Sequence, residues 1–219
     1  MHKQLTFWHA LTLAAAVLPT AYLAWAWAAL PARIPTHFGA GSIDGYTDRG
    51  NIWLFTTALP LAVYALLRAL PRLDPRQHLA ANSLSFAKLQ ALLLAALGSA
   101  AAYVIWLGLH PGTLPGRGVS ATVALFFALV GNYLSTVPPN YFVGIRTPWA
   151  LQNDQVWAKT HRFGGRLWFG GGLLLAALAF VLPAGWCEAG LALLGLGGGV
   201  AAYLYSYRCY RQALRSLSA

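Results

Sequence analysis

The chain has 219 residues, of which 58% are hydrophobic and 9% are charged, and its formal net charge is +10 at pH 7. Soluble domains carry about 25% charged residues, so this composition excludes an ordinary soluble domain and indicates a membrane protein. Its two cysteines, Cys187 and Cys209, are too few for a disulfide framework. The positive charge is compatible with a nucleic-acid-binding protein until its position along the chain is known.

Six apolar stretches approach the length of about 20 residues that a helix needs to cross the hydrocarbon core. In chain order they are residues 8–30, 52–67, 89–109, 119–137, 167–182 and 189–207. The first stretch exceeds the usual apolar run of a signal peptide, about 7–15 residues, so we expect it to be retained. We predict an all-α integral membrane protein with six transmembrane helices.

Lysine and arginine are distributed unequally between the predicted loops. With a cytoplasmic N-terminus, the outer segments hold Arg33, Arg49 and Arg117, and the inner segments hold the other twelve of the fifteen basic residues. These twelve are Lys3, Arg68, Arg72, Arg76, Lys88, Arg146, Lys159, Arg162, Arg166, Arg208, Arg211 and Arg215. Basic loops favour the cytoplasm, so both termini are predicted to be cytoplasmic. Topology explains the net charge, and direct nucleic-acid binding loses its main support.

The first outer loop, residues 31–50, is rich in Pro and Gly and predicts a structured, turn-rich loop rather than a helix. His37, Asp44 and Asp48 carry ligand types that bind metals. Their spacing matches no known closed site, so we favour a hydrogen-bonded loop and predict neither a metal nor another cofactor.

An inner segment between the fourth and fifth predicted helices predicts an amphipathic interfacial helix. Thr147 is a suitable N-cap, and Pro148 suits the first helical position. Gly164 and Gly165 are expected to end this helix.

Trp149, Val156 and Phe163 repeat every seven residues in this segment and therefore share one helix face. That face would rest on the inner headgroup layer of the lipid bilayer.

Several polar residues of this segment are not needed for a helix that only anchors the protein at the membrane surface. Arg146 and Asp154 could form an ion pair, or they could meet a peptide partner together with His161; the spacing leaves both open. Asn132, near the inner end of the fourth helix, is expected to hydrogen-bond a neighbouring helix.

No HExxH, P-loop or GxSxG motif is present, so we predict that the protein is not an enzyme.

Two groups of residues resemble known families. The inner group resembles the SdpI immunity-protein family, and it consists of Asn132, Pro139-Asn140, Gly144, "RTPW" at 146–149, Trp157, "THR" at 160–162 and Gly164-Gly165. The outer "IPTHFGAGSIDGY" at 34–46 is similar to a short membrane domain of unknown function that often precedes this motif. It departs from the usual pattern at Gly39, where asparagine is common, and at Asp48-Arg49, where lysine is common.

The resemblance implies two membrane domains in the bacterial plasma (inner) membrane. Residues 1–110 would form the first, with helices one to three and the outer loop 31–50. Residues 111–219 would form the second, with helices four to six and the inner motif loop 138–166. It also implies immunity to a secreted killing peptide, and a receptor role in which a cytoplasmic repressor is held at the membrane.

We expect three sets of site residues under this hypothesis. The inner binding and signalling set is Asn140, Arg146, Trp149, Asp154, Trp157, His161 and Arg162. The outer set that would meet the peptide is His37, Asp44 and Tyr46. The structural set is Asn132, Pro139, Gly144, Pro148, Gly164 and Gly165.

Two alternatives remain open on the sequence. One is a membrane-bound enzyme, metal-dependent or not, that acts on a lipid or a peptide through His37 with Asp44 outside or through His161 inside. The other is a small-molecule exporter. It is less favoured, because no Asp, Glu, Lys or Arg lies in the core of a predicted span, where ion-coupled carriers use such residues.

Overall fold

The structure is a computed structural model that describes residues 2–39, 42–73, 84–113 and 117–217. Long helices dominate it, and one β-hairpin is present. The elements are α1 (His2–Ala26), η1 (Trp27–Ala29), β1 (Arg33–Gly39), β2 (Ser42–Asp48), η2 (Arg49–Asn51), η3 (Leu54–Ala58), α2 (Leu59–Leu73), α3 (Leu84–Leu109), α4 (Arg117–Leu134), α5 (Pro148–Gln152), α6 (Asp154–Leu178), α7 (Ala184–Ala192), η4 (Leu193–Gly197) and α8 (Gly198–Leu217).

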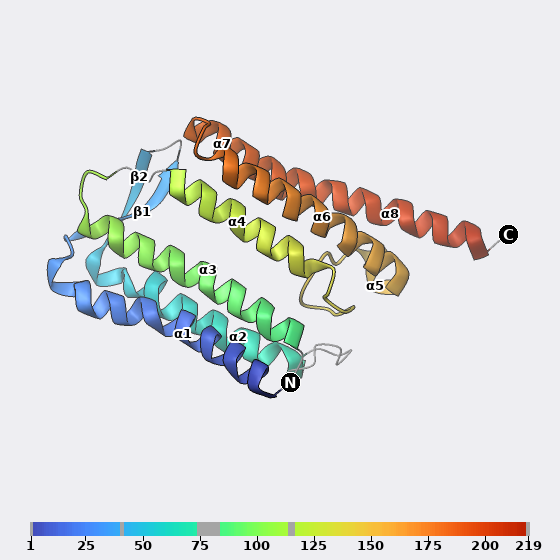
Figure 1. The fold of residues 1–219 in the computed structure, drawn as a ribbon, viewed down its shortest axis with the longest axis horizontal. Coiled ribbons are helices and arrows are strands. Elements are labelled where there is room, and N and C mark those ends of the chain that lie inside the picture. The colour runs from blue at the N-terminus through green and yellow to red at the C-terminus, as the bar shows by residue number, and fades with distance from the viewer. Residues whose placement is uncertain (1, 40–41, 74–83, 114–116, 218–219) are drawn as a thin grey trace.

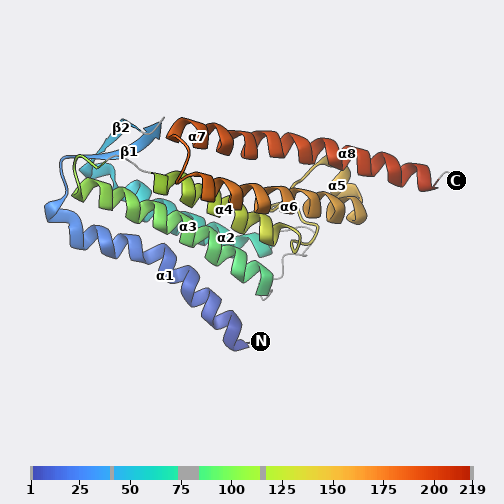
Figure 2. The same cartoon turned by 45° about the horizontal axis from the view of Figure 1, so that its top comes forward.

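The long helices lie side by side along the length of the molecule (Figure 1). α1, α2 and α3 pack on one another, and α4, α6 and α8 form a second group that contacts the first through α3 and α4. The hairpin and α7 lie at one end, which we call the hairpin end (Figures 1 and 2). Both termini and α5 lie at the opposite end, which we call the termini end. The predicted domain boundary at residue 110 falls between the two helix groups and stays a prediction.

Among the described residues, four helical stretches are long and apolar enough to cross a membrane: Lys3–Ala29, Arg49–Leu73, Leu84–Leu109 and Ala184–Ser216. Many large apolar side chains on these helices are exposed, including Leu18, Trp25 and Leu196, as expected where lipid is the solvent. The chain is a multi-pass membrane protein. α4 is apolar but shorter, and α6 is charged up to Arg166 and apolar after it, so six spans stay a prediction.

The helix that was expected to end at Gly164 and Gly165 does not end there. α6 continues through both glycines without a break, from Asp154 to Leu178. The prediction of one separate helix over these residues is therefore wrong, because they form the short α5 and the first half of α6. A position of this segment near the membrane interface stays a prediction. Glycine inside a helix is tolerated where it lets another backbone come close.

The outer loop is a β-hairpin rather than an irregular loop. β1 and β2 are antiparallel, with Arg33 opposite Asp48 and Thr36 hydrogen-bonded to Thr47 at 2.8 Å between hydroxyl oxygens. The β-branched residues of this segment favour strands. The turn-rich loop was predicted instead because the segment is also rich in Pro and Gly. The fold is thus helical with one hairpin, and not purely α.

Ile34 helps to anchor the hairpin to the helices. Ile34 of β1 is fully buried in a cluster with Leu30, Ile52 and Ile105. A completely buried isoleucine contributes about 1.5–3 kcal/mol relative to an exposed one. This contact holds the hairpin against the ends of α1 and α3.

Candidate functional site

The inner motif lies at the termini end, between the end of α4 and the start of α6 (Figure 1). The predicted helix start is confirmed: Thr147 caps α5 by accepting a hydrogen bond from the Ala150 N–H at 3.1 Å, and Pro148 follows as the first helical residue. Asn153 caps α6 in the same way, by accepting bonds from the N–H groups of Gln155 and Val156.

Asn140 organises the loop that leaves α4. Its side chain is completely buried and makes four hydrogen bonds with the loop backbone. The amide nitrogen donates to the carbonyls of Pro138 and Val143, and the amide oxygen accepts from the N–H groups of Phe142 and Val143, all at 2.7–2.9 Å. Asn140 is therefore a structural residue of the loop, and in this conformation it is not accessible to a partner.

His161 ties the same loop to α6. Its Nε2 accepts a hydrogen bond from the Ile145 N–H at 3.0 Å, so Nδ1 carries the proton and donates to the carbonyl of Trp157 at 2.9 Å. The ring also stacks on Trp157, with 4.0 Å between ring centroids. Burial lowers the pKa of His161 to about 4, although its hydrogen bond to Trp157 acts in the opposite direction.

Gly144 is required where the loop passes over this histidine. Its φ of +117° is a backbone conformation that glycine adopts readily and other residues rarely do. A Cβ at this position would also overlap Nε2 of His161. The prediction that Gly144 is structural thus has two physical reasons.

The aromatic face of the inner segment packs on α8 and not on lipid. Val156 and Trp157 are buried together with Cys209, and the indole of Trp157 donates to the Val137 carbonyl at 2.9 Å. Trp149 packs against Tyr203 and Tyr207 of α8, with 5.0 Å between ring centroids in each pair. The prediction that this face rests on the headgroup layer is wrong, because α8 runs alongside α5 and α6 and covers it.

The remaining members of the inner set lie at the surface. Arg146, Asp154 and Arg162 are exposed. Arg146 donates from Nη1 to the Tyr141 carbonyl, and Asp154 occupies the first turn of α6, where a carboxylate complements the helix dipole. Asn132 is also exposed, and its side chain makes no hydrogen bond among the described residues. Its expected bond to a neighbouring helix is therefore not present.

The outer set lies on the hairpin. Nδ1 of His37 and Oδ1 of Asp44 are 2.6 Å apart across the two strands, and both side chains are exposed. Tyr46 is exposed as well. Asp48 instead pairs with Arg33 at 3.7 Å, at the other end of the hairpin. No group of three potential metal ligands forms among the described residues.

Comparison with known proteins matches both regions to families. Residues 136–207 match the SdpI/YfhL protein family, and residues 14–59 match the Domain of unknown function (DUF1648). The C-terminal part of the chain is therefore similar to the SdpI family. The Immunity protein SdpI of Bacillus subtilis (strain 168) is 33% identical over 58 residues, which are 26% of this chain and 28% of that relative. No solved structure matches the chain.

The SdpI-family match covers the inner motif from residue 136 onward and α8 up to residue 207, and the role of α8 in the site was not predicted. Ser206 of α8 is fully buried, and its hydroxyl lies 2.6 Å from that of Thr147. Tyr203, Ser206 and Tyr207 follow the helical spacing of one face. These polar and aromatic residues within a predicted span were the sequence signal that this face of α8 packs against α5.

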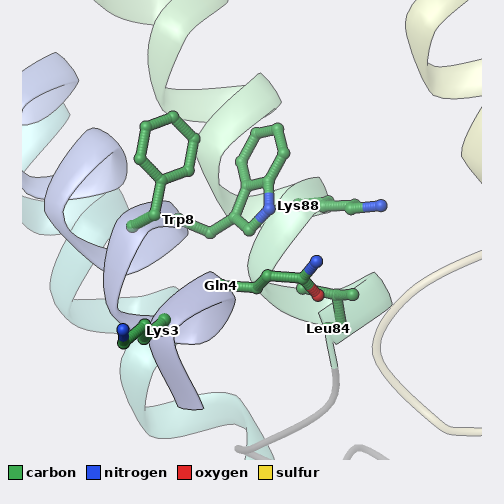
Figure 3. A pocket seen from close by; sticks show the side chains of 6 residues that line it. Lys3, Gln4, Trp8, Leu84 and Lys88 are labelled. Atoms are coloured by element: carbon green, nitrogen blue, oxygen red, sulfur yellow. The ribbon is translucent and has the colours of Figure 1, made fainter. Parts of the chain in front are cut away.

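A separate basic hollow opens between α1 and α3, also at the termini end (Figure 3). Lys3 and Gln4 line it from α1, and Leu84 and Lys88 from α3. The ammonium of Lys88 lies 5.8 Å from the centre of the Trp8 ring, so this charge already has an aromatic partner.

Proposed function

We propose that this chain is a membrane-embedded immunity protein that protects its cell from a secreted killing peptide. The observation that carries the proposal is the similarity to a relative named as an immunity protein, together with the match of the inner motif to its family. The network around Asn140 and His161 supports it. It holds the motif as one ordered unit and occupies both ring nitrogens of His161 with hydrogen bonds.

The proposal includes an orientation in the bacterial plasma membrane. The termini end would face the cytoplasm and the hairpin end the outside. The distribution of basic residues supports this, since lysine and arginine favour cytoplasmic segments. In this orientation His37, Asp44 and Tyr46 of the hairpin face the killing peptide and would form the first contact with it.

A regulatory role would use the opposite end. Gln152, Asn153, Asp154 and Gln155 line a polar hollow with the end of α8. Together with exposed Arg146 and Arg162, this surface would receive a cytoplasmic repressor. The buried residues of the inner set, Asn140, Trp157 and His161, would act by holding that surface in shape.

Protection is tested in a host that a secreted killing peptide kills when it carries an empty vector. We expect the wild-type chain to raise the tolerated peptide concentration. The Asp44→Asn variant should lower that concentration about ten-fold, because a charge-assisted hydrogen bond to His37 is lost, while membrane abundance stays unchanged. Asp48→Asn, which removes an equal charge from the same strand, is the matched control and should protect like the wild type.

Two outcomes would contradict different parts of the proposal. Equal killing of cells with the wild-type chain and with the empty vector would reject the immunity function. Full protection by Asp44→Asn and His37→Ala would leave immunity standing and reject the hairpin as the contact with the peptide.

A membrane-bound enzyme is the second candidate function, and one observation favours it. A carboxylate that orients a histidine, as Asp44 orients His37, is the arrangement that prepares a general base. The inner version of this hypothesis is disfavoured, because both nitrogens of His161 are occupied. Metal bound stoichiometrically to the purified protein and lost on His37→Ala would favour the enzyme over the immunity protein.

A further inference from the structure

A polar groove lies between α4 and α6 at the termini end, and we call it the α4–α6 groove. Asn132 and Ser135 line it from α4, and Arg162, Arg166 and Phe169 line it from α6. The immunity proposal uses only Arg162 of these residues, and it uses none of the groove as a site.

Two glycines bring the helices together at the floor of the groove. A Cβ at Gly131 would lie 2.5 Å from the backbone nitrogen of Phe169, and one at Gly165 would lie 2.8 Å from the Gly131 carbonyl oxygen. The backbones are thus in direct contact there. Because the helices approach so closely, polar side chains from both helices line the same groove.

Most polar groups of the groove make no hydrogen bond or ion pair within the part of the chain that the structure describes. Among the described residues, neither Arg162 nor Arg166 has a carboxylate partner, and the side chains of Asn132 and Ser135 make no hydrogen bond. Arg162 uses only Nε, which donates to the Ala158 carbonyl at 3.3 Å. Two guanidinium groups, an amide and a hydroxyl therefore present unused donors to one groove.

Three other basic residues of the termini end differ in this respect. Arg146 donates to a carbonyl of its own loop, and Arg211 donates to the Tyr207 hydroxyl at 3.0 Å. Lys88 lies over Trp8. Membrane topology by itself accounts for these charges, but it does not account for uncommitted donors that converge.

The surface next to the groove changes from charged to apolar along the helices. On α6, Phe169 and Leu173 follow Arg166 on the same face and are 42% and 45% exposed. On α4, which runs antiparallel to α6, Leu125 and Leu129 precede Asn132 on one face and are also exposed. Cationic donors followed by exposed apolar side chains match a molecule with an anionic head and an acyl tail.

We propose that the α4–α6 groove binds the phosphate of an anionic phospholipid in the leaflet at the termini end. Arg162 and Arg166 donate to the phosphate oxygens, a geometry for which guanidinium is suited. Asn132 and Ser135 donate from the other wall, and the acyl chains lie along Phe169 and Leu173. The inference does not depend on the immunity function.

The test measures lipid binding to the full chain purified in detergent, by native mass spectrometry. Phosphatidylglycerol and phosphatidylcholine are the two probes, and inorganic phosphate is the competitor. The groove variant is Arg162→Gln with Arg166→Gln. The matched control is Lys159→Gln with Arg208→Gln, which removes the same charge from exposed positions of the same end outside the groove.

We expect the wild type to prefer phosphatidylglycerol, and the groove variant to bind it about 10–30 times more weakly. The control variant should bind like the wild type, and inorganic phosphate should not displace the lipid. Equal binding of both lipids, or equal loss in both double variants, would overturn the proposal. Displacement by inorganic phosphate would assign the groove to a soluble anion instead.

The melting temperature without added lipid establishes that each variant is folded. If the double groove variant does not fold, Arg166→Gln alone is measured. Its guanidinium makes no hydrogen bond or ion pair with another described residue, so the fold should tolerate its removal. Unchanged phosphatidylglycerol binding by this single variant would also overturn the proposal.

Discussion

At neutral pH the ring of His161 is uncharged and held on three sides. One nitrogen accepts from Ile145, the other donates to Trp157, and the face of the ring stacks on the indole. A second proton on Nε2 would remove its acceptor and leave a charge in a buried site. The role of this residue is therefore to hold the inner loop on α6, and titration is costly there.

This burial predicts a dependence of stability on pH. The pKa of His161 is about 4 when the protein is folded and about 6.5 when it is unfolded, so only the unfolded chain gains this proton between those values. The free energy of unfolding should therefore fall as pH falls below about 6.5, with this residue contributing a loss of about 2 kcal/mol at pH 5. Melting temperatures between pH 7.5 and 4.5, about the range of this titration, measure the effect.

The His161→Gln variant is the control for that measurement. Glutamine can accept from Ile145 through its amide oxygen and does not titrate. All other titratable groups contribute equally to both proteins, so the variant should lose less stability in acid than the wild type. Parallel pH profiles would contradict a neutral, buried His161.

At the scale of elements, α4 and α6 are held together by small residues. Gly131 meets Gly165 at the termini end, and two turns further along α6 a Cβ at Gly172 would lie 2.5 Å from the Ala124 carbonyl oxygen. Backbone contact of this kind stabilises helix pairs through van der Waals packing, which persists in lipid where the hydrophobic effect does not drive association. The glycines thus determine the distance between the helices.

Alanine substitutions at two glycines of α6 distinguish the effect of helix packing on stability from the effect of helix propensity. Gly165→Ala should lower the free energy of unfolding by about 1–3 kcal/mol, because the added methyl group meets backbone atoms. Gly170→Ala is the control: no atom lies within 4 Å of its Cβ position. It should be neutral or stabilising by up to about 1 kcal/mol. Equal melting temperatures for the two variants would contradict the close crossing of α4 and α6.

At the scale of the whole molecule, the proposed function depends on which end of the molecule faces the outside. The hairpin and α7 lie at one end, and both termini and the inner motif at the other (Figure 1). The native cysteines lie near opposite ends, and both are buried, at 2% and 3% exposure for Cys187 and Cys209. Neither is therefore suited to report the orientation by labelling.

Labelling of cysteines introduced at exposed positions would report directly which end of the protein faces the outside. Gly185→Cys lies in α7 at the hairpin end, and Ser216→Cys lies near the C-terminus. A membrane-impermeant thiol reagent should label the first in intact cells or spheroplasts and the second only after lysis. The wild type, which keeps both buried cysteines, is the background control. Labelling of Ser216→Cys before lysis would invert the topology and place the inner motif outside.

Local sequence patterns predicted the features that depend on neighbours along the chain. The helix start at Thr147 and Pro148 is confirmed, because a cap needs only the next few residues. The apolar stretches predicted membrane helices, and the inner motif predicted the match of residues 136–207 to the SdpI family, since both are continuous in sequence. Asn140 and Gly144 were recognised as important without their contacts being known.

The side of each element that is buried, and what covers it, was decided only by tertiary structure. The face with Trp149 and Val156 has the periodicity of a lipid-facing helix, yet α8 covers it. Gly164 and Gly165 have the composition of a helix end, yet they lie inside α6, where Ile145 and Gly131 approach them. Periodicity determines that a face is apolar, whereas the choice between lipid and protein depends on helices distant in sequence. For the same reason, the convergence of Asn132 and Arg166 could be seen only once α4 and α6 were side by side.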